Sequence, residues 1–258
     1  MIEETAHRVQ IVAHRGGAGL AAENSMTAFR HALELGVDAI EIDVHQSADG
    51  EIVVHHDATL ERTTQGHGPV NAMHWDALSQ IGLKETQDDH LPRLEDVLLL
   101  LNGTSCGLSL EIKQDQHHQP YGGIAPRILE TIQRLQFTND LFIHSFYWPE
   151  LIYFQDAAPQ IKLGANVEKD QYETFSTMND LYQAISDLGF REVNIDHRLY
   201  DEAALALAQE QGLRTTLWTV NAPDDLKRWL ALPVRSIATD HPDRALAMRE
   251  LGLHTDRS

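Results

Sequence analysis

This chain has very little cysteine, no long apolar run and no recognisable signal sequence. It holds one cysteine, Cys106, among 258 residues, which excludes an internal disulfide and fits a reducing compartment. No apolar run approaches the roughly 18 residues of a membrane-spanning helix, and the longest conspicuous one is Val97 to Leu101. The start, MIEETAHRVQ, lacks the basic and apolar parts of a secretory signal. We therefore expect a cytoplasmic protein without stable membrane insertion, unless a leader was removed.

Positive charge is also scarce. The chain has 20 Lys and Arg residues against 39 Asp and Glu residues, a formal net charge of -19. The field of such a protein repels nucleic acid and anionic lipid surfaces, so neither is expected to be its main partner. A small anionic substrate is not excluded. Its site must gather positive charge locally, from a few side chains or a metal ion.

Short apolar or β-branched runs alternate with helical patterns along the chain, which is typical of an α/β fold. The candidate strands are Val9–Ala13, Ala39–Val44, Leu108–Ile112, Leu141–Ser145, Lys162–Asn166, Glu192–Ile195, Thr215–Val220 and Ser236–Thr239. Eight strands alternating with helices predict a (β/α)8 TIM barrel. The length suits one large domain, so we expect residues 1–258 to form a single barrel.

Several helix ends are readable in the sequence. Ser25 or Asn24 is a candidate N-cap for one helix, and Asp201 for another. Glycines at positions 36 and 212 are candidate stops for these two helices. The stretch from Asn221 to Pro223 is expected to open a further helix.

The apolar run 51–55 leaves no room for a helix after the second strand. The preceding Asp49–Gly50 is a strong signal for a two-residue hairpin loop. Counting outwards from that loop sets Asp43 opposite His56. Because side chains alternate across a strand, Glu41, Asp43 and His56 are then expected on one face. The sequence thus predicts a hairpin arm beside the barrel.

The segment 59–91 is polar and contains glycines, and we expect it to be an insertion that serves as a lid or a specificity region. Its apolar residues have the spacing of a short amphipathic helix packed on the barrel. They are Met73, Trp75, Leu78, Ile81 and Leu83.

Acidic side chains at strand ends suggest a metal site. Glu41 and Asp43 stand two residues apart, so they share a face, and Glu111 ends another strand. Three inward carboxylates repel one another unless a cation is present. Oxygen ligands favour Mg²⁺, Ca²⁺ or Mn²⁺ over Zn²⁺. The alternative is a salt-bridged core in which Lys113 and Arg15 neutralise the acids.

Basic side chains near these acids suit a phosphate group. Arg15 presents a planar fork and Lys113 a point charge, while the glycine-rich stretch 16–19 exposes backbone N–H groups. A glycine-rich loop alone is a weak signal. The imidazoles of His14 and His56 exchange protons near neutral pH, so this pair is a candidate general acid and base.

The remaining histidines have plainer interpretations. His55 is expected to point away from His56, while His117 and His118 lie in a polar loop. A further group near element ends is expected to form structural hydrogen bonds: His74, His144, His197 and His241. Trp218 stands near a strand end, where it either lines a pocket or fills the barrel.

Short motifs spread from Ile11 to Pro242 resemble the glycerophosphodiester phosphodiesterase family. They are AHRG at 13–16, EN at 23–24, EIDV at 41–44, HDATLERTT at 56–64, LPRLEDVL at 91–98, LEIK at 110–113, SF at 145–146, WTVN at 218–221 and TDHP at 239–242. None is diagnostic alone, but together and in this order they are specific. The resemblance implies a barrel enzyme that splits glycerophosphodiesters, such as glycerophosphocholine or glycerophosphoethanolamine, into sn-glycerol 3-phosphate and an alcohol.

The resemblance also implies roles for individual residues. One divalent cation, Mg²⁺ or Ca²⁺, would be held by Glu41, Asp43 and Glu111. His14 and His56 would be the acid and the base, Arg15 and Lys113 would hold the phosphoryl oxygens, and Phe146 and Trp218 would line the substrate pocket. Two positions depart from the family pattern: Ala22 stands in place of proline, and His55 in place of an apolar residue.

Other functions remain open at this level. The same site is compatible with a lysophospholipase D or with a lyase that forms a cyclic phosphate. A barrel that senses phosphate without catalysis is a further alternative. The sequence decides neither the oligomeric state nor whether water or the substrate's 2-hydroxyl is the nucleophile.

Overall fold

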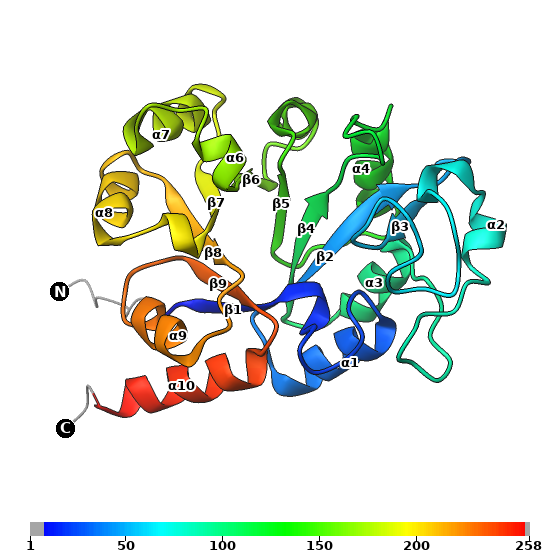
Figure 1. Ribbon diagram of the computed structural model, residues 1–258, viewed down its shortest axis with the longest axis horizontal. Coiled ribbons are helices and arrows are strands. Elements are labelled where there is room, and N and C mark those ends of the chain that lie inside the picture. Colours follow the sequence, from blue (N-terminus) through cyan, green and yellow to red (C-terminus); the bar gives the residue numbers. More distant parts are fainter. Residues whose placement is uncertain (1–7, 256–258) are drawn as a thin grey trace.

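Eight parallel strands close into a barrel (Figure 1). The computed structural model describes residues 8–255, so the expectation about the first seven residues lies outside it. The barrel strands are β1 (Gln10–Ala13), β2 (Ala39–Gln46), β4 (Gly107–Ile112), β5 (Leu141–Ser145), β6 (Lys162–Val167), β7 (Glu192–Asp196), β8 (Arg214–Trp218) and β9 (Ser236–Thr239). Strand β1 pairs in parallel with both β9 and β2, which closes the ring. The predicted (β/α)8 fold is confirmed.

Helices surround the barrel in Figure 1. The longer ones are α1 (Met26–Leu35), α3 (Leu94–Leu101), α4 (Ile124–Arg134), α7 (Met178–Asp187), α8 (Glu202–Glu210), α9 (Pro223–Leu230) and α10 (Pro242–Thr255). The shorter ones are α2 (Trp75–Leu78), α5 (Ile152–Ala157) and α6 (Lys169–Tyr172). Buried apolar residues of strands and helices form the main core between the two layers. Within residues 8–255, every helix is too short or too polar to cross a membrane.

Most of the predicted helix ends are found. Ser25 Oγ accepts the N–H of Ala28 at 3.0 Å, and Asp201 Oδ1 accepts the N–H of Ala204 at 2.8 Å. The helix predicted to open at Asn221 to Pro223 begins at Pro223, but Ala222, rather than Asn221, occupies its N-cap position. The side chain of Asn221 instead donates to Asp240 at 2.6 Å.

The predicted hairpin exists, but its register is wrong by one residue. Strand β3 (Ile52–Val54) is antiparallel to β2, with Val44 opposite Val54. The loop holds three residues, because Ser47 pairs with Glu51: the N–H of Ser47 donates to the carbonyl of Glu51, and the N–H of Glu51 donates to Ser47 Oγ, each at 2.9 Å. Gly50 takes a left-handed φ of 92° that such a loop requires. Consequently His55, rather than His56, donates its N–H to the carbonyl of Asp43, at 3.0 Å.

The segment 59–91 lies beyond β3, at the right of Figure 1 in cyan. Its buried apolar side chains form a small cluster together with Val53 of β3, and they are Leu60, Val70, Leu78, Leu83 and Leu91. The predicted amphipathic helix is reduced to the four residues of α2. Thr59 is the residue of this segment that lines the cavity described below, and a role as a lid stays a prediction.

Candidate active site

A cavity of about 630 Å³ opens at the carboxyl ends of the barrel strands. All but one of the predicted site residues line it, namely His14, Arg15, Glu41, His56, Glu111, Lys113, Phe146 and Trp218. The exception is Asp43, which is buried behind the lining residues. Strand ends in a closed barrel converge on one place, which is why residues so far apart in the sequence meet here.

The three predicted metal ligands form a compact group of carboxylates. Oxygen atoms of Glu41, Asp43 and Glu111 lie within 4.8 Å of one another, and all three residues are buried. Parallel pairing of β2 with β4 sets Asp43 beside Glu111. Burial, with the adjacent charges of Asp43 and Glu111, raises the pKa of Glu41 well above its usual value. Buried carboxylates this close together repel one another, which favours binding of a cation, and an oxygen donor set of this kind fits Mg²⁺ or Ca²⁺.

Two cations border the carboxylates. Lys113 Nζ lies 2.6 Å from Glu111 and 3.4 Å from Asp43, and Arg15 Nε lies 3.4 Å from Asp43. Although burial acts in the opposite direction, Lys113 and Arg15 hold the pKa of Asp43 below its usual value. Ion pairs of the kind expected for a salt-bridged core are therefore present. Two cations against three carboxylates still leave a negative balance, which a divalent ion can neutralise.

Arg15 occupies a constrained turn at the end of β1. Its φ of 51° is left-handed, a conformation that costs a residue with a side chain about 1 kcal/mol or more. In return, its backbone N–H donates to Glu41 at 2.8 Å and its Nη1 donates to Glu23 at 3.0 Å. This turn therefore aims both the backbone and the guanidinium of one residue at the acidic site.

His14 is oriented by the carboxylate of Asp240, which lies in the loop after β9. Its Nδ1 lies 2.6 Å from Asp240 Oδ1, while Asp240 Oδ2 accepts from Asn221 at 2.6 Å. Burial would raise the pKa of Asp240, but the bond to His14 keeps it below its usual value. An ionised Asp240 makes Nδ1 the protonated nitrogen of His14, which leaves Nε2 for a ligand.

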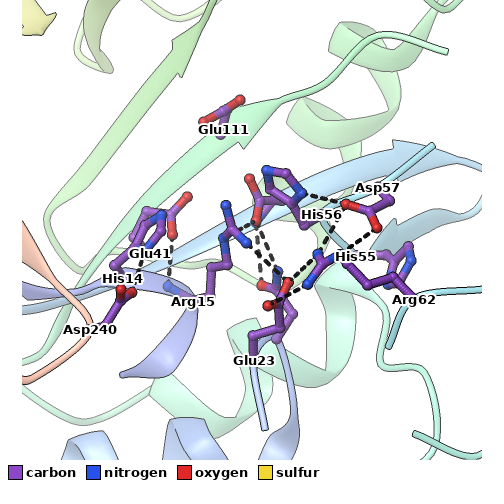
Figure 2. Close-up of polar contacts among 12 residues, drawn as sticks. His14, Arg15, Glu23, Glu41, His55, His56, Asp57, Arg62, Glu111 and Asp240 are labelled. Carbon is purple, nitrogen blue, oxygen red and sulfur yellow. Dashed lines mark hydrogen bonds and ion pairs between the residues drawn. The ribbon is translucent and has the colours of Figure 1, made fainter. Parts of the chain in front are cut away.

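His56 has a matching arrangement on the other side of Arg15 in the view of Figure 2. Its Nδ1 lies 2.7 Å from Asp57, which in turn accepts from Arg62 Nε at 2.6 Å. Arg62 also donates two bonds to Glu23, at 2.7 and 2.8 Å. Burial, together with Lys113, lowers the pKa of His56 to about 4, so the ring is neutral and able to accept a proton.

His55 and His56, next to each other in the hairpin arm, point in different directions as expected. The expected reason, alternation of side chains along a strand, does not apply. Strand β3 ends at Val54, so the chain leaves the sheet before His56 and the alternation of side chains no longer applies. His56 lines the cavity, whereas His55 is buried and bonds through Nε2 to the carbonyl of Thr59 at 3.1 Å. His55 thus secures the start of the inserted segment.

Sequence reasoning overlooked His45, which also lines the cavity. Its Nε2 lies 3.1 Å from the carbonyl of His56, and its Nδ1 lies 2.7 Å from the hydroxyl of Tyr121. A carbonyl only accepts, so His45 donates from Nε2 and the Tyr121 hydroxyl donates to Nδ1. The alternation that grouped Glu41 with Asp43 extends to His45 and was the available signal.

Asn24 joins the first loop to the acidic group. Its Nδ2 donates to Asp43 Oδ2 at 2.9 Å, and its own φ of 53° is left-handed. The loop thus keeps its position beside the carboxylates although Ala22 replaces the family's proline.

Aromatic rings form another wall of the cavity. Phe146 and Trp218 meet edge to face with ring centroids 5.7 Å apart, and Lys113 Nζ lies 5.9 Å from the centroid of Phe146. Trp218 therefore lines the cavity, the first of the two possibilities that the sequence left open.

Of the other histidines, His118 lines the cavity at its exposed loop, and His144 lines it deep in the barrel. His144 forms the structural hydrogen bonds that were expected of it, and burial lowers its pKa to about 3, so it is uncharged at neutral pH.

Comparison with known proteins agrees with this geometry. A model of the glycerophosphoryl diester phosphodiesterase family matches residues 14–244. A glycerophosphodiester phosphodiesterase from Bacillus altitudinis is 33% identical over 249 residues, which are 93% of this chain and 98% of that protein.

Solved structures share the fold. An Agrobacterium tumefaciens protein assigned as a glycerophosphoryl diester phosphodiesterase has a TM-score of 0.91 at 23% identity, over 96% of this chain and 99% of its own. An Oleispira antarctica phosphodiesterase, in complex with the product sn-glycerol-3-phosphate, has a TM-score of 0.81 at 23% identity, over 94% of this chain and 97% of its own. The motifs, the family match and the Bacillus relative agree. The chain therefore belongs to the glycerophosphoryl diester phosphodiesterase family.

Proposed function

We propose that this protein hydrolyses glycerophosphodiesters to sn-glycerol 3-phosphate and an alcohol, with one divalent cation and with His14 and His56 as acid and base. The observation that carries the proposal is the pairing of each histidine with a carboxylate, in a cavity that is bordered by a cluster of three buried acids. The product complex of the Oleispira antarctica phosphodiesterase supports the choice of substrate.

Glu41, Asp43 and Glu111 would hold the cation, which would supply positive charge to the phosphate group of the substrate. Arg15 and Lys113 contribute further positive charge to the phosphoryl oxygens as negative charge builds up on them. Both side chains border the carboxylates, so a phosphate bound there lies among cations in an otherwise acidic protein.

The two histidines divide the proton transfers. One imidazole takes the proton of the attacking hydroxyl group while the other gives a proton to the departing alkoxide as its P–O bond breaks. The nucleophile is water or the substrate's own 2-hydroxyl. In the second case a cyclic phosphate forms first, and water then opens it with the roles of the histidines exchanged.

The test is release of sn-glycerol 3-phosphate from a panel of glycerophosphodiesters and lysolipids, with chelator and with single metals restored. We expect turnover of the glycerophosphodiesters that requires Mg²⁺ or Ca²⁺. His14→Ala and His56→Ala should each lower kcat by roughly 10²–10⁴-fold, whereas His67→Ala, an exposed histidine of the insertion, should not.

Two results contradict the proposal. One is a double variant of His14 and His56 that keeps the parental rate. The other is turnover that is confined to lysolipids, which would indicate a lysophospholipase D.

A further inference from the structure

The backbone of His56 is held by a side chain of the neighbouring strand. Strand β3 ends two residues before it, and the N–H of His55 donates to the carbonyl of Asp43 at 3.0 Å. At His56 the chain has left the sheet, and His45 Nε2 donates to its carbonyl at 3.1 Å. Asp57 bonds the ring of His56 through Nδ1, as Figure 2 shows. One bond to the backbone and one to the ring therefore place this imidazole in the cavity.

His45 is itself oriented by Tyr121. The tyrosine hydroxyl lies 2.7 Å from His45 Nδ1, and the two rings meet edge to face with centroids 5.8 Å apart. A carbonyl accepts but does not donate, so the proton of His45 is on Nε2 and Nδ1 is an acceptor. The hydroxyl of Tyr121 supplies the proton for that acceptor. Tyr121 thus favours the tautomer of His45 that can bond the carbonyl of His56.

Both side chains stand on rigid parts of the barrel. His45 lies on β2 opposite Val53 of β3, and it is 1% exposed. Tyr121 precedes α4 and belongs to the main hydrophobic core. Water is largely excluded at both residues, so a lost hydrogen bond would leave a buried polar group unsatisfied. The chain of bonds therefore runs from the core, through His45, to the backbone of His56.

Filling space does not by itself account for this pair. A core that needed volume alone would hold apolar side chains here, because a buried imidazole or hydroxyl costs free energy unless it is bonded. The bonds of His45 and Tyr121 offset that cost, and they end on the backbone of a residue that lines the cavity. The arrangement thus fixes the place of His56 as well as filling the core.

We propose that His45 and Tyr121 are positioning residues for His56, and that they act on turnover by fixing the location of its backbone. The inference rests on the proposed function, because that function gives His56 a proton transfer. A displacement of about 1 Å at a reacting group can lower a rate by about 100-fold. Loss of the bond to the carbonyl of His56 is therefore expected to lower kcat.

Two substitutions of His45 separate the hydrogen bond from the volume. His45→Leu fills the space without a donor, and kcat should fall by roughly 10- to 100-fold. KM should change much less, because Arg15, Lys113 and the cation hold the phosphate. His45→Gln can present an amide N–H in the place of Nε2, so it should keep most of the parental kcat. Equal losses of kcat in the Leu and Gln variants would overturn the proposal.

Tyr121→Phe tests the same bond with the loss of one hydroxyl group, and it serves if His45→Leu does not fold. We expect kcat to fall by about tenfold. Tyr182→Phe is the matched control, since its buried hydroxyl donates to the carbonyl of Ala204 at 3.1 Å, outside the cavity lining. Thermal unfolding of both variants reports the loss of stability. The same kcat in both tyrosine variants would overturn the proposal.

A double-mutant cycle shows whether His45 acts through His56. In the His56→Ala background, His45→Leu should lower kcat no further, because the ring that it positions is missing. Losses that multiply in the double variant would indicate a separate structural effect and overturn the proposal.

The cycle also separates the two proposals. A His56→Ala variant with the parental kcat would contradict the proposed function and the positioning role together. A large loss of kcat in His56→Ala, without any loss in His45→Leu, would retain the proposed function and overturn the positioning role alone.

Discussion

Each histidine of the proposed acid–base pair has one ring nitrogen bonded to a carboxylate. For His14 the partner is Asp240, and for His56 it is Asp57. Such a bond fixes both the ring orientation and the nitrogen that carries the proton, and it stabilises the imidazolium that forms during proton transfer. Asp240 and Asp57 are thus expected to influence turnover indirectly, by positioning the imidazole rings of His14 and His56.

Asp240→Asn should separate this positioning effect from folding. Loss of the charge behind His14 is expected to lower kcat by about 10- to 100-fold, with a smaller change in KM. Steady-state kinetics on a glycerophosphodiester measures both. Asp243→Asn, an exposed position in the first turn of α10, is the control and should behave as wild type. An unchanged kcat in Asp240→Asn would show that the bond does not matter for the reaction.

Residue types and spacing predicted much of this site. The spacing of two residues between Glu41 and Asp43 sufficed to place both inward, because alternation holds inside a strand. Spacing did not predict the ion pairs behind His56. There Arg62 joins Asp57, the partner of His56, to Glu23, and the residues come from separate segments of the chain. Contacts of that kind depend on loop conformation, which the sequence pattern does not encode.

Arg62 links several structural elements. It joins Glu23 in the loop before α1 to Asp57 in the loop after β3, from its own place in the inserted segment. Although burial opposes the effect, the hydrogen bonds from Arg62 lower the pKa of both Glu23 and Asp57. Because the folded state holds these protons less tightly, the interaction stabilises the fold above the ordinary carboxyl pKa and is lost as the pH falls.

Arg62→Met should therefore destabilise the protein by about 1 kcal/mol at pH 7, a modest value since the guanidinium is partly exposed. The difference from wild type should shrink as the pH is lowered through and below about 4. Urea unfolding at a series of pH values measures it. Arg30→Met, an exposed position on α1, is the control. A difference that stays constant or grows toward acid pH would refute the assignment of these ion pairs.

The hairpin of β2 and β3 shows why the presence of a strand was easier to predict than its pairing register. The Asp49–Gly50 signal correctly located the turn. The loop gained a third residue because Ser47 Oγ also donates to Asp49 at 2.6 Å, and this local bonding competes with the two-residue turn. One local side-chain hydrogen bond thus shifts the register of β2 against β3 by one residue, which the pattern of apolar residues does not specify.

The whole molecule is strongly acidic, with a formal charge of -19, yet its cavity places Arg15 and Lys113 beside a few carboxylates. Alternating strands and helices over this length were enough to predict the closed barrel. The buried polar cluster inside the barrel was beyond such reasoning, because its side chains come from four strands and meet only when the barrel closes; they are Ser109, His144, Asn166 and Asn194. His144 was accordingly interpreted as a structural residue alone.

The central claim is that Glu41, Asp43 and Glu111 together hold one divalent cation. Anomalous diffraction from crystals grown with Mn²⁺ in place of Mg²⁺ tests it most directly. The account predicts a single strong anomalous peak within coordination distance of all three carboxylates. A map with no peak there, and with the acids paired only to Arg15 and Lys113, would contradict it.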